Sequence, residues 1–544
     1  MRSNRLFVLP LLFHLGSAPS LLQGQDSREP VNIAVGIASP NELQNLLRDE
    51  NVLFIKTSAF FDPTSAGKGS REPVWLAFRG RERVGVFSMD EVPPRGEGEE
   101  AKRMDFTKDA PGSWLTPGFC DALSAWFLDP ASWKERGLDL SVKARERLQP
   151  WQKGWDELPL GSGITTVYVP PSFGADQAGP GALVKLDSGG DPEAGPGGAL
   201  FLRLASPTRK ATNLDRGKVA KTLASLLDAA KAYEKARRKW KKERKEYEKK
   251  RKAFLDWYRK NPLKPGDKEP SGATPAKKGK GRRSGRRMAK LTPELIEKIL
   301  KRYPPQLRDR IRKQLEAQMK LQQARAAKAK AEAAPKDGKK TASAKDPKKK
   351  TAPKRPAFPK EPKRDPVKEA LLEVLAGKRL LRVEVHRAEE IRAVLALAKE
   401  RKIGKMVLVG ASEAWKVAKE IRRAGVSVLL LPETVKQPGL ELLPDHAAAN
   451  AAALAREGVE FCFGSAGRES ARLLPVLAAA AVARGADENA VLTALSRAAY
   501  ESSGRDWKSG ATGWVVWSED PFAPTARVLG LFDGRKLRLL GGGR

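Results

Sequence analysis

The sequence predicts an α/β protein. It consists of a (β/α)8 TIM-like barrel, a small β-sandwich domain built from both chain ends, and a long basic insertion within the barrel, partly helical and partly disordered. Three observations predict this. Short strand-like runs lie near both ends of the chain, strand and helix patterns alternate between them, and one strongly basic segment interrupts the alternation. Alternation at short spacing is typical of βα units around a parallel sheet.

Residues 1–25 have the pattern of a secretory signal peptide. Arg2 and Arg5 precede an apolar stretch at 6–15, and small residues follow at 16–20. Cleavage near Ser20 and cleavage after Gln25 both fit. No later run reaches the roughly 18 apolar residues that a membrane span needs. We therefore expect an exported protein, periplasmic or extracellular, with no transmembrane segment.

Residues 26–115 are predicted to form the N-terminal part of the sandwich, because short apolar runs such as 52–55 and 74–78 are separated by Gly, Pro, Asp and Arg. Residues 116–230 are predicted to form the first half of the barrel. They contain strand-like runs at 165–169 and 200–202 and end in a helical stretch at 219–230.

The insertion is assigned to residues 231–365. Of the net charge of +37, roughly +32 lies between residues 231 and 370. One apolar stripe repeats every seven residues along a charged helix: Leu226, Tyr233, Trp240, Tyr247 and Phe254. A second helical tract begins at Thr292 and would fold back on the first. Tracts 270–287 and 334–366, rich in Lys, Pro, Gly and Ala, are predicted to be disordered.

Order is predicted to return in residues 366–504, the second half of the barrel. Strand-like runs at 381–385, 405–409, 426–431 and 459–463 alternate with helical runs at 391–400, 413–424, 447–457 and 473–483. Residues 505–544 contain two more short strands, at 513–517 and 528–532, and form the C-terminal part of the sandwich.

The two cysteines, Cys120 and Cys462, exclude a disulfide scaffold and a zinc site built from cysteine. They fall on the first and last barrel strands. Counting by twos from Ala125 and Ala466 predicts that Cys120 points outward and Cys462 inward, and therefore that both thiols are free.

Several short motifs occur in the order that one known family has them. They are 117–125, similar to Pro-Gly-Phe-x-Asp-x-His-x-His; 163–167, similar to Gly-x-Thr-Thr; 386–391 and 412–417; and 515–521 and 532–535, similar to closing sandwich strands. Together they resemble the amidohydrolase superfamily, in particular the imidazolonepropionase-like branch of metal-dependent hydrolases with a composite β-sandwich domain. The resemblance covers most of the chain outside the insertion.

This resemblance implies one or two divalent metals at the C-terminal mouth of the barrel, which lower the pKa of a bound water. The expected ligand positions, however, are occupied by Leu123, Ala125, Gly410 and Ala466, whose side chains cannot bind metal. The sequence holds three histidines, and His14 leaves with the signal peptide. His446 is expected at a helix start beside Asp445. Glu384 and His386 are the remnant candidates for a catalytic or metal-binding role.

Three functions follow as hypotheses. The first is an exported amidohydrolase-like scaffold or binding protein without metal-dependent hydrolysis, for which no cofactor is expected. The second is an active hydrolase of non-peptide C–N bonds, with zinc or another divalent metal held by Glu384 and His386. The third is binding of an anionic polymer, an envelope polysaccharide or a nucleic acid, through residues 231–365. A simply solvated charged surface is the alternative to the third.

Other chemistries are weaker. A phosphate-loop spacing at 174–179 is followed by Pro180 where lysine is required, and Ser465 lies one residue short of a nucleophile elbow. A Ser/His/Asp triad around His386 stays open. The substrate, any specific partner and the oligomeric state are not predicted.

Overall fold

The structure is a computed structural model. It describes residues 40–65, 69–94, 96, 99–126, 148, 160–171, 177–186, 193–204, 218–261, 354–432, 443, 445–467, 469–508, 510–534 and 536–540. The predicted signal peptide, the helical tract from Thr292 and the tract 270–287 lie outside these residues. The chain forms two compact units, one of Met1–Glu234 with Arg364–Arg544 and one of Lys235–Lys363.

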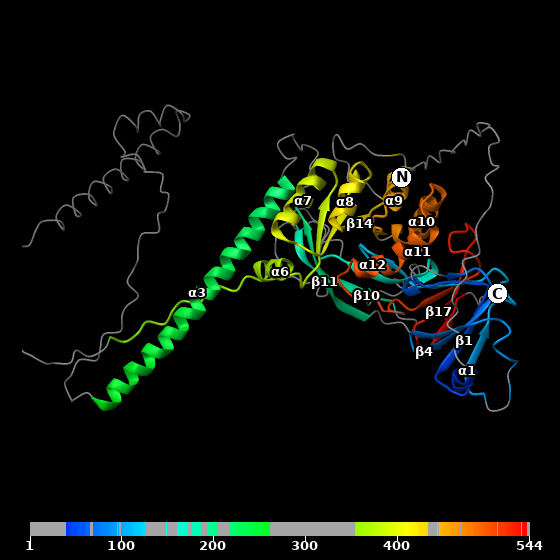
Figure 1. The fold of residues 1–544 in the computed structure, drawn as a ribbon, viewed down its shortest axis with the longest axis horizontal. Coiled ribbons are helices and arrows are strands. Elements are labelled where there is room, and N and C mark those ends of the chain that lie inside the picture. Colours follow the sequence, from blue (N-terminus) through cyan, green and yellow to red (C-terminus); the bar gives the residue numbers. More distant parts are fainter. Residues whose placement is uncertain are drawn as a thin grey trace, which may run out of the picture. The chain divides into compact units, whose positions relative to one another are not determined.

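An eight-stranded barrel sheet is the centre of the first unit (Figure 1). Its strands neighbour one another in chain order: β8 (Phe119–Asp121), β9 (Ile164–Val169), β10 (Gln177–Lys185), β11 (Glu193–Arg203), β12 (Leu381–Val385), β13 (Met406–Gly410), β14 (Ser427–Leu430) and β15 (Phe461–Phe463). The amide of Ala122 donates to the carbonyl of Phe463 at 3.1 Å, which brings the first strand to the last. The predicted barrel is thereby confirmed.

One strand departs from the predicted βα alternation. β10 is antiparallel to both β9 and β11, whereas the other neighbouring strands in this sheet run parallel. Antiparallel neighbours are joined by short turns and need no crossover helix. Residues 177–179, the described part of the phosphate-loop spacing, therefore belong to a barrel strand that also contains Pro180.

Helices cover the outside of the parallel strands. They are α6 (Pro366–Leu375), α7 (Ala388–Arg401), η5 (Ala414–Val417), α8 (Ala418–Ala424), α9 (His446–Arg456), η6 (Glu469–Leu473), α10 (Leu474–Ala483) and α11 (Glu488–Leu495). The short helix α12 (Arg497–Glu501) instead contributes to the apolar cluster inside the barrel. Val383 and Val385 of β12 pack with Ile391 of α7 in the layer between sheet and helices. None of the helices that the structure describes has the length and apolar character needed to cross a membrane.

The sandwich contains strands from both chain ends, as predicted. One sheet has the order β5 (Glu82–Phe87), β4 (Val74–Arg79), β1 (Val52–Thr57), β6 (Lys102–Asp105). The other has the order β18 (Leu537–Leu539), β17 (Val528–Phe532), β16 (Trp514–Trp517), β7 (Trp114–Pro117), β2 (Ala59–Phe61), β3 (Gly69–Ser70). Phe78 of the first sheet packs edge-on against Trp514 and Phe532 of the second. A short helix, α1 (Pro40–Leu47), contributes to the apolar cluster beside the first sheet.

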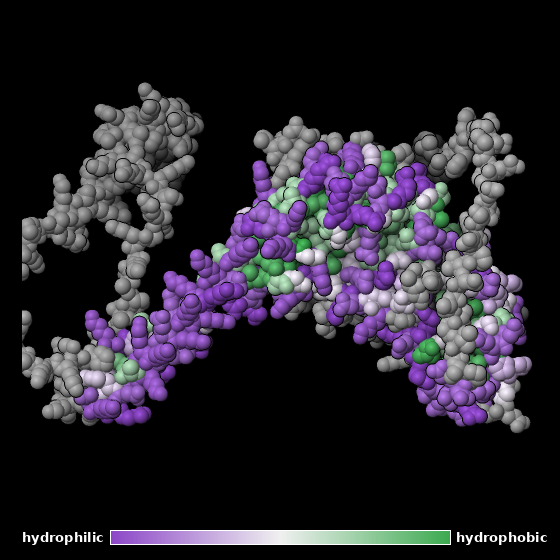
Figure 2. Space-filling view, in the orientation of Figure 1, coloured by the Kyte–Doolittle hydropathy of each residue, from purple (hydrophilic) through white to green (hydrophobic). Residues whose placement is uncertain are grey.

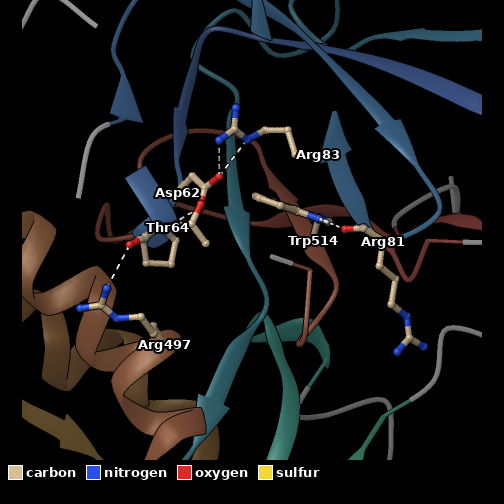
Figure 3. A network of polar contacts seen from close by, with 7 residues as sticks. Asp62, Thr64, Arg81, Arg83, Arg497 and Trp514 are labelled. Carbon is tan, nitrogen blue, oxygen red and sulfur yellow. Dashed lines mark hydrogen bonds and ion pairs between the residues drawn. The ribbon is translucent and has the colours of Figure 1, made fainter. Parts of the chain in front are cut away.

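Polar contacts join the sandwich to the barrel (Figure 3). Asp62, almost fully buried, forms an ion pair with Arg83 at 2.6 Å and accepts from Thr64. In the adjoining η1 (Pro63–Ser65), the carbonyl of Pro63 accepts from Arg497 of α12 at 3.2 Å. These contacts connect η1, beside strand β2 of the sandwich, to α12.

A single helix, α3 (Lys218–Lys260), begins in the first unit and continues into the second. In the first unit its buried face includes Leu223 and Leu227, and the hydroxyl of Tyr233 donates to Glu369 at 3.1 Å. The predicted apolar stripe is therefore on a real helix.

Within the second unit the stripe has an extended partner. The indole of Trp240 donates to the carbonyl of Pro359 at 3.2 Å, and the Tyr247 ring meets the Phe358 ring edge-on at 5.2 Å. Residues 354–363 contain neither helix nor strand. A Pro-containing strap thus covers part of the stripe, and it belongs to the tract 334–366 that the sequence predicted to be disordered.

The prediction for Cys120 is wrong. Cys120 and Cys462 both belong to the apolar cluster inside the barrel, and burial raises the pKa of the Cys462 thiol to about 12. Counting by twos from Ala125 fails because β8 ends at Asp121, and the residues beyond it no longer alternate. Both cysteines are free thiols in the structure.

Candidate functional site at the mouth of the barrel

The first and last strands meet at one side of the mouth. The amide of Ala466 donates to the carbonyl of Leu123 at 2.7 Å, and the amide of Ala125 donates to the carbonyl of Gly467 at 3.2 Å. Leu123 and Ala125 are buried. The three positions predicted to replace metal ligands on these strands therefore lie together, joined by backbone hydrogen bonds. Ala466 holds a positive φ of 53°.

Asp121, at the end of β8, ties the same two strands together. Its carboxylate accepts from the Ser465 hydroxyl at 2.5 Å and from the amides of Ser465 at 2.8 Å and Leu123 at 3.2 Å. Burial raises the pKa of Asp121 to about 6, against the opposing effect of these hydrogen bonds, because an ionised carboxylate is costly away from water.

The opposite side of the mouth carries polar side chains from three consecutive strands. The carboxylate of Glu384 on β12 forms an ion pair with Nε of Arg203, the last residue of β11, at 3.0 Å. Its other oxygen lies 3.5 Å from Nε2 of His386. The second ring nitrogen, Nδ1, lies 2.9 Å from Oγ of Ser412, which follows β13. Residues 384, 386 and 412 are all buried.

The charge state of Glu384 follows from these contacts. Burial alone would raise its pKa, but Arg203 and His386 outweigh burial and hold the pKa below its usual value. Glu384 is therefore ionised at neutral pH. In the neutral tautomer that carries its proton on Nε2, His386 donates to the Glu384 carboxylate, and its Nδ1 accepts a hydrogen bond from Ser412.

Gly410 makes room for the His386 ring. A Cβ added to Gly410 would lie 2.4 Å from Cε1 of His386, and the glycine holds a φ of 80°. The family resemblance assigns a metal ligand to position 410, and the space for that side chain is occupied by the ring of His386, which follows the neighbouring strand β12.

Arg382, two residues before Glu384, crosses the barrel interior. It is fully buried, its Nη2 donates to the carbonyl of Ala122 at 2.6 Å, and its guanidinium lies 4.1 Å from the ring centroid of Tyr168. Burial lowers the pKa of Arg382, while Tyr168 and the two thiols act in the other direction. Nε and Nη1 have no hydrogen-bond partner among the described residues. The Arg382 side chain therefore links β12 to the end of β8.

His446 is not part of this group. It is the first residue of α9, as the sequence predicted, and its Nε2 donates to the carbonyl of Leu431 at 3.1 Å. Burial lowers the pKa of its imidazole. Asp445 precedes it but makes no side-chain capping bond, because its carboxylate pairs with Arg484.

Comparisons with known proteins bear on the fold. No family model matches this chain, and no curated protein matches it in sequence. Among solved structures, an amidohydrolase from Thermotoga maritima MSB8 aligns with 89% of this chain and 98% of its own, at 19% identity and a TM-score of 0.53. This chain has the amidohydrolase fold. Molinate hydrolase (13% identity, 89% of this chain and 94% of that one, TM-score 0.38) and phenylurea hydrolase B (12%, 90% and 96%, TM-score 0.39) are also similar.

An amidohydrolase fold raises the question of whether the mouth fits a metal. Among the residues that the structure describes, no three His, Cys, Asp or Glu side chains converge as a metal ion requires. Glu384 and His386 are adjacent, but the carboxylate is occupied by a guanidinium and the ring by Ser412 and Glu384. A divalent cation would have to displace Arg203 and would find two protein ligands where catalytic sites use three. The donor set does not fit the group.

Proposed function

We propose that this protein is an exported amidohydrolase-fold protein that does not carry out metal-dependent hydrolysis and instead acts as a scaffold or binding module. The observation that carries the proposal is the mouth of the barrel. Leu123, Ala125, Gly410 and Ala466 offer no ligand, and the two remaining candidates are saturated by protein partners. The basic and then apolar N-terminus supports export.

The test is metal analysis of the full mature protein purified without chelator. We expect far less than one equivalent of any divalent metal, and a melting temperature that EDTA leaves unchanged. A resident metal at 100 times its Kd would contribute about 2.7 kcal/mol, which a melting curve resolves easily. One equivalent of zinc that survives dialysis and is lost in His386→Ala would establish the rival hypothesis, a hydrolase of non-peptide C–N bonds using Glu384 and His386.

Polyanion binding by the insertion is a second candidate, favoured by the exposure of its cations. Between residues 235 and 260, α3 carries 14 Lys or Arg and 4 Asp or Glu, and nearly all the basic side chains are exposed. Figure 2 shows this helix as almost continuously hydrophilic. Clustered cations release counterions from a polyanion, so the affinity would fall steeply with salt.

A matched charge-reversal pair tests this candidate. Lys241, Lys242, Lys245 and Lys252 on α3 are changed together to Glu, and the control changes four exposed lysines of the first unit, Lys102, Lys399, Lys405 and Lys419. Both variants lose the same net charge. Binding to a heparin column should weaken strongly in the first only, with a smaller dependence on salt. Equal losses in both variants would assign the binding to net charge and remove the candidate.

A further inference from the structure

Three buried side chains at the mouth form a continuous hydrogen-bonded series from a hydroxyl to a carboxylate. Ser412 Oγ lies 2.9 Å from His386 Nδ1, and His386 Nε2 lies 3.5 Å from Glu384 Oε1. An imidazole between a hydroxyl and a carboxylate is the arrangement that turns serine into a nucleophile. None of the three is a metal ligand in this arrangement.

The polarity of the series suits that role. Arg203 pairs with the second oxygen of Glu384 at 3.0 Å and keeps the carboxylate charged. In the neutral tautomer that donates Nε2–H to this carboxylate, Nδ1 carries the lone pair that faces the Ser412 hydroxyl. The imidazole can therefore take the hydroxyl proton without first changing its tautomer.

The backbone that presents Ser412 is sharply bent. Gly410 and Ala411 have consecutive positive φ values of 80° and 33°, at the point where β13 ends and the chain turns toward η5. The turn is held from several directions. The amide of Ala411 donates to Val385, the amide of Glu413 donates to His386, and the side-chain amide of Asn450 donates to the carbonyls of Ala411 and Ser412.

Such strain persists only where the surroundings over-determine it, and it recurs where a side chain must be held in one place. The serine also lies at the C-terminal ends of barrel strands, the end at which TIM-barrel enzymes place their chemistry. We propose that Ser412 is a nucleophile activated by His386, with Glu384 as the positioning residue for the imidazole, and that its substrates are small carboxylic esters or similarly activated acyl groups.

The step balances without a metal. Ser412 Oγ bonds to the acyl carbon as its proton passes to His386 Nδ1. The bond from carbon to the leaving oxygen then breaks, and that oxygen takes the proton from His386. Water repeats the sequence on the acyl-serine, giving up one proton to His386 Nδ1 and releasing a carboxylic acid while the serine recovers its proton. The positive charge that forms on His386 faces the Glu384 carboxylate.

The inference rests on the first part of the proposed function, that no metal occupies the mouth, and it adds a metal-free reaction to the binding role. Because Ser412 is only 2% exposed, labelling also measures whether a probe can reach its hydroxyl. A small organophosphorus fluoride, diisopropyl fluorophosphate, is the probe, because an activated serine displaces its fluoride and keeps the phosphoryl group.

The experiment treats the full mature protein with the probe and maps the adduct by mass spectrometry, with metal content measured on the same sample. We expect one adduct on Ser412 and none on Ser465, a buried serine at the same mouth that faces Asp121 rather than an imidazole. His386→Gln should slow labelling at least about 100-fold, the usual contribution of a general base. Glu384→Gln should slow it less, and Glu384→Asp should recover part of the rate.

Near-ultraviolet circular dichroism of each variant separates loss of reaction from loss of folding. Folded wild-type protein that stays unlabelled and metal-free overturns this inference and leaves the proposed function standing. Bound metal overturns the proposed function. Labelling that persists in Ser412→Ala, or that proceeds at the wild-type rate in folded His386→Gln, also overturns the assignment of Ser412.

Discussion

The two sides of the barrel mouth differ in how they hold their strands together. On the side of β8 and β15, small and apolar residues stand at the positions that the family resemblance assigns to ligands. Backbone hydrogen bonds run directly between Leu123, Ala125 and the loop after β15. On the side of strands four to six the polar side chains remain, but Arg203, Glu384, His386 and Ser412 bind one another.

The difference shows two ways in which the mouth of this barrel is filled by the protein's own groups. One side is closed by backbone, so a ligand there would have to open the barrel. The other side holds a carboxylate, an imidazole and a hydroxyl group in contact with one another, the arrangement on which the proposed reaction depends. Arg382 connects the two, since it leaves strand five and donates to the backbone of strand one.

The largest effect is expected where this connection is removed. Arg382→Ala leaves a cavity in the barrel and deprives the Ala122 carbonyl of its donor, which together should cost about 3–5 kcal/mol of unfolding free energy. Arg382→Met fills most of the space and removes a buried charge, so it should cost less than about 1.5 kcal/mol. Urea unfolding measures both. Equal losses would show that the hydrogen bond, not the volume, joins the two sides.

The next effect concerns Asp121 and depends on pH. Its folded pKa of about 6 lies above the unfolded value of 3.8, so the folded state binds the proton more tightly. Stability from this group is therefore full below about pH 4 and falls as pH rises to about 6, by on the order of 3 kcal/mol.

Asp121→Asn cannot ionise and serves as the reference for this measurement. The difference in unfolding free energy between wild type and Asp121→Asn should move against the wild type across that pH range. A difference that is constant with pH would mean that Asp121 is not the group that titrates.

A smaller effect should distinguish the two sides through their backbone strain. Gly410→Ala places a methyl group against the His386 ring at a φ of 80° and should cost about 2 kcal/mol, with loss of Ser412 labelling. Ala466→Gly, at a φ of 53°, relaxes a strained alanine and should change stability by less than about 1 kcal/mol. Thermal melts of both variants make the comparison. A costly Ala466→Gly would show that the closed side also depends on its side chains.

The parallel strands of the barrel could be predicted from the sequence, but the antiparallel strand β10 could not. β12 was predicted with its observed bounds. All five of its residues are buried, as is usual for a strand of a parallel sheet that is covered on both faces. β10 was missed because glycine and proline dominate its first half, and these residues normally end strands. Only pairing with β9 and β11, which lies outside any local pattern, shows that it belongs to the barrel.

The site was predicted in part. Glu384 and His386 were singled out because they are two residues apart on one predicted strand and because the sequence has only three histidines. Ser412 and Arg203 were missed, since each is an ordinary residue at a strand end and gains its role from a partner on the next strand. The Glu413 carboxylate, which accepts from the Ala388 amide at the start of α7, was missed for the same reason. Cross-strand register, not spacing along the chain, creates these contacts.

One feature of the sandwich bears on how the protein is made. β16 pairs with β7, and the Trp517 indole donates to the Thr116 hydroxyl across a separation of 401 residues. Contacts of such long range form late, because the intervening chain must first be synthesised and its loop entropy overcome. The sandwich therefore stays incomplete until the last part of the chain emerges.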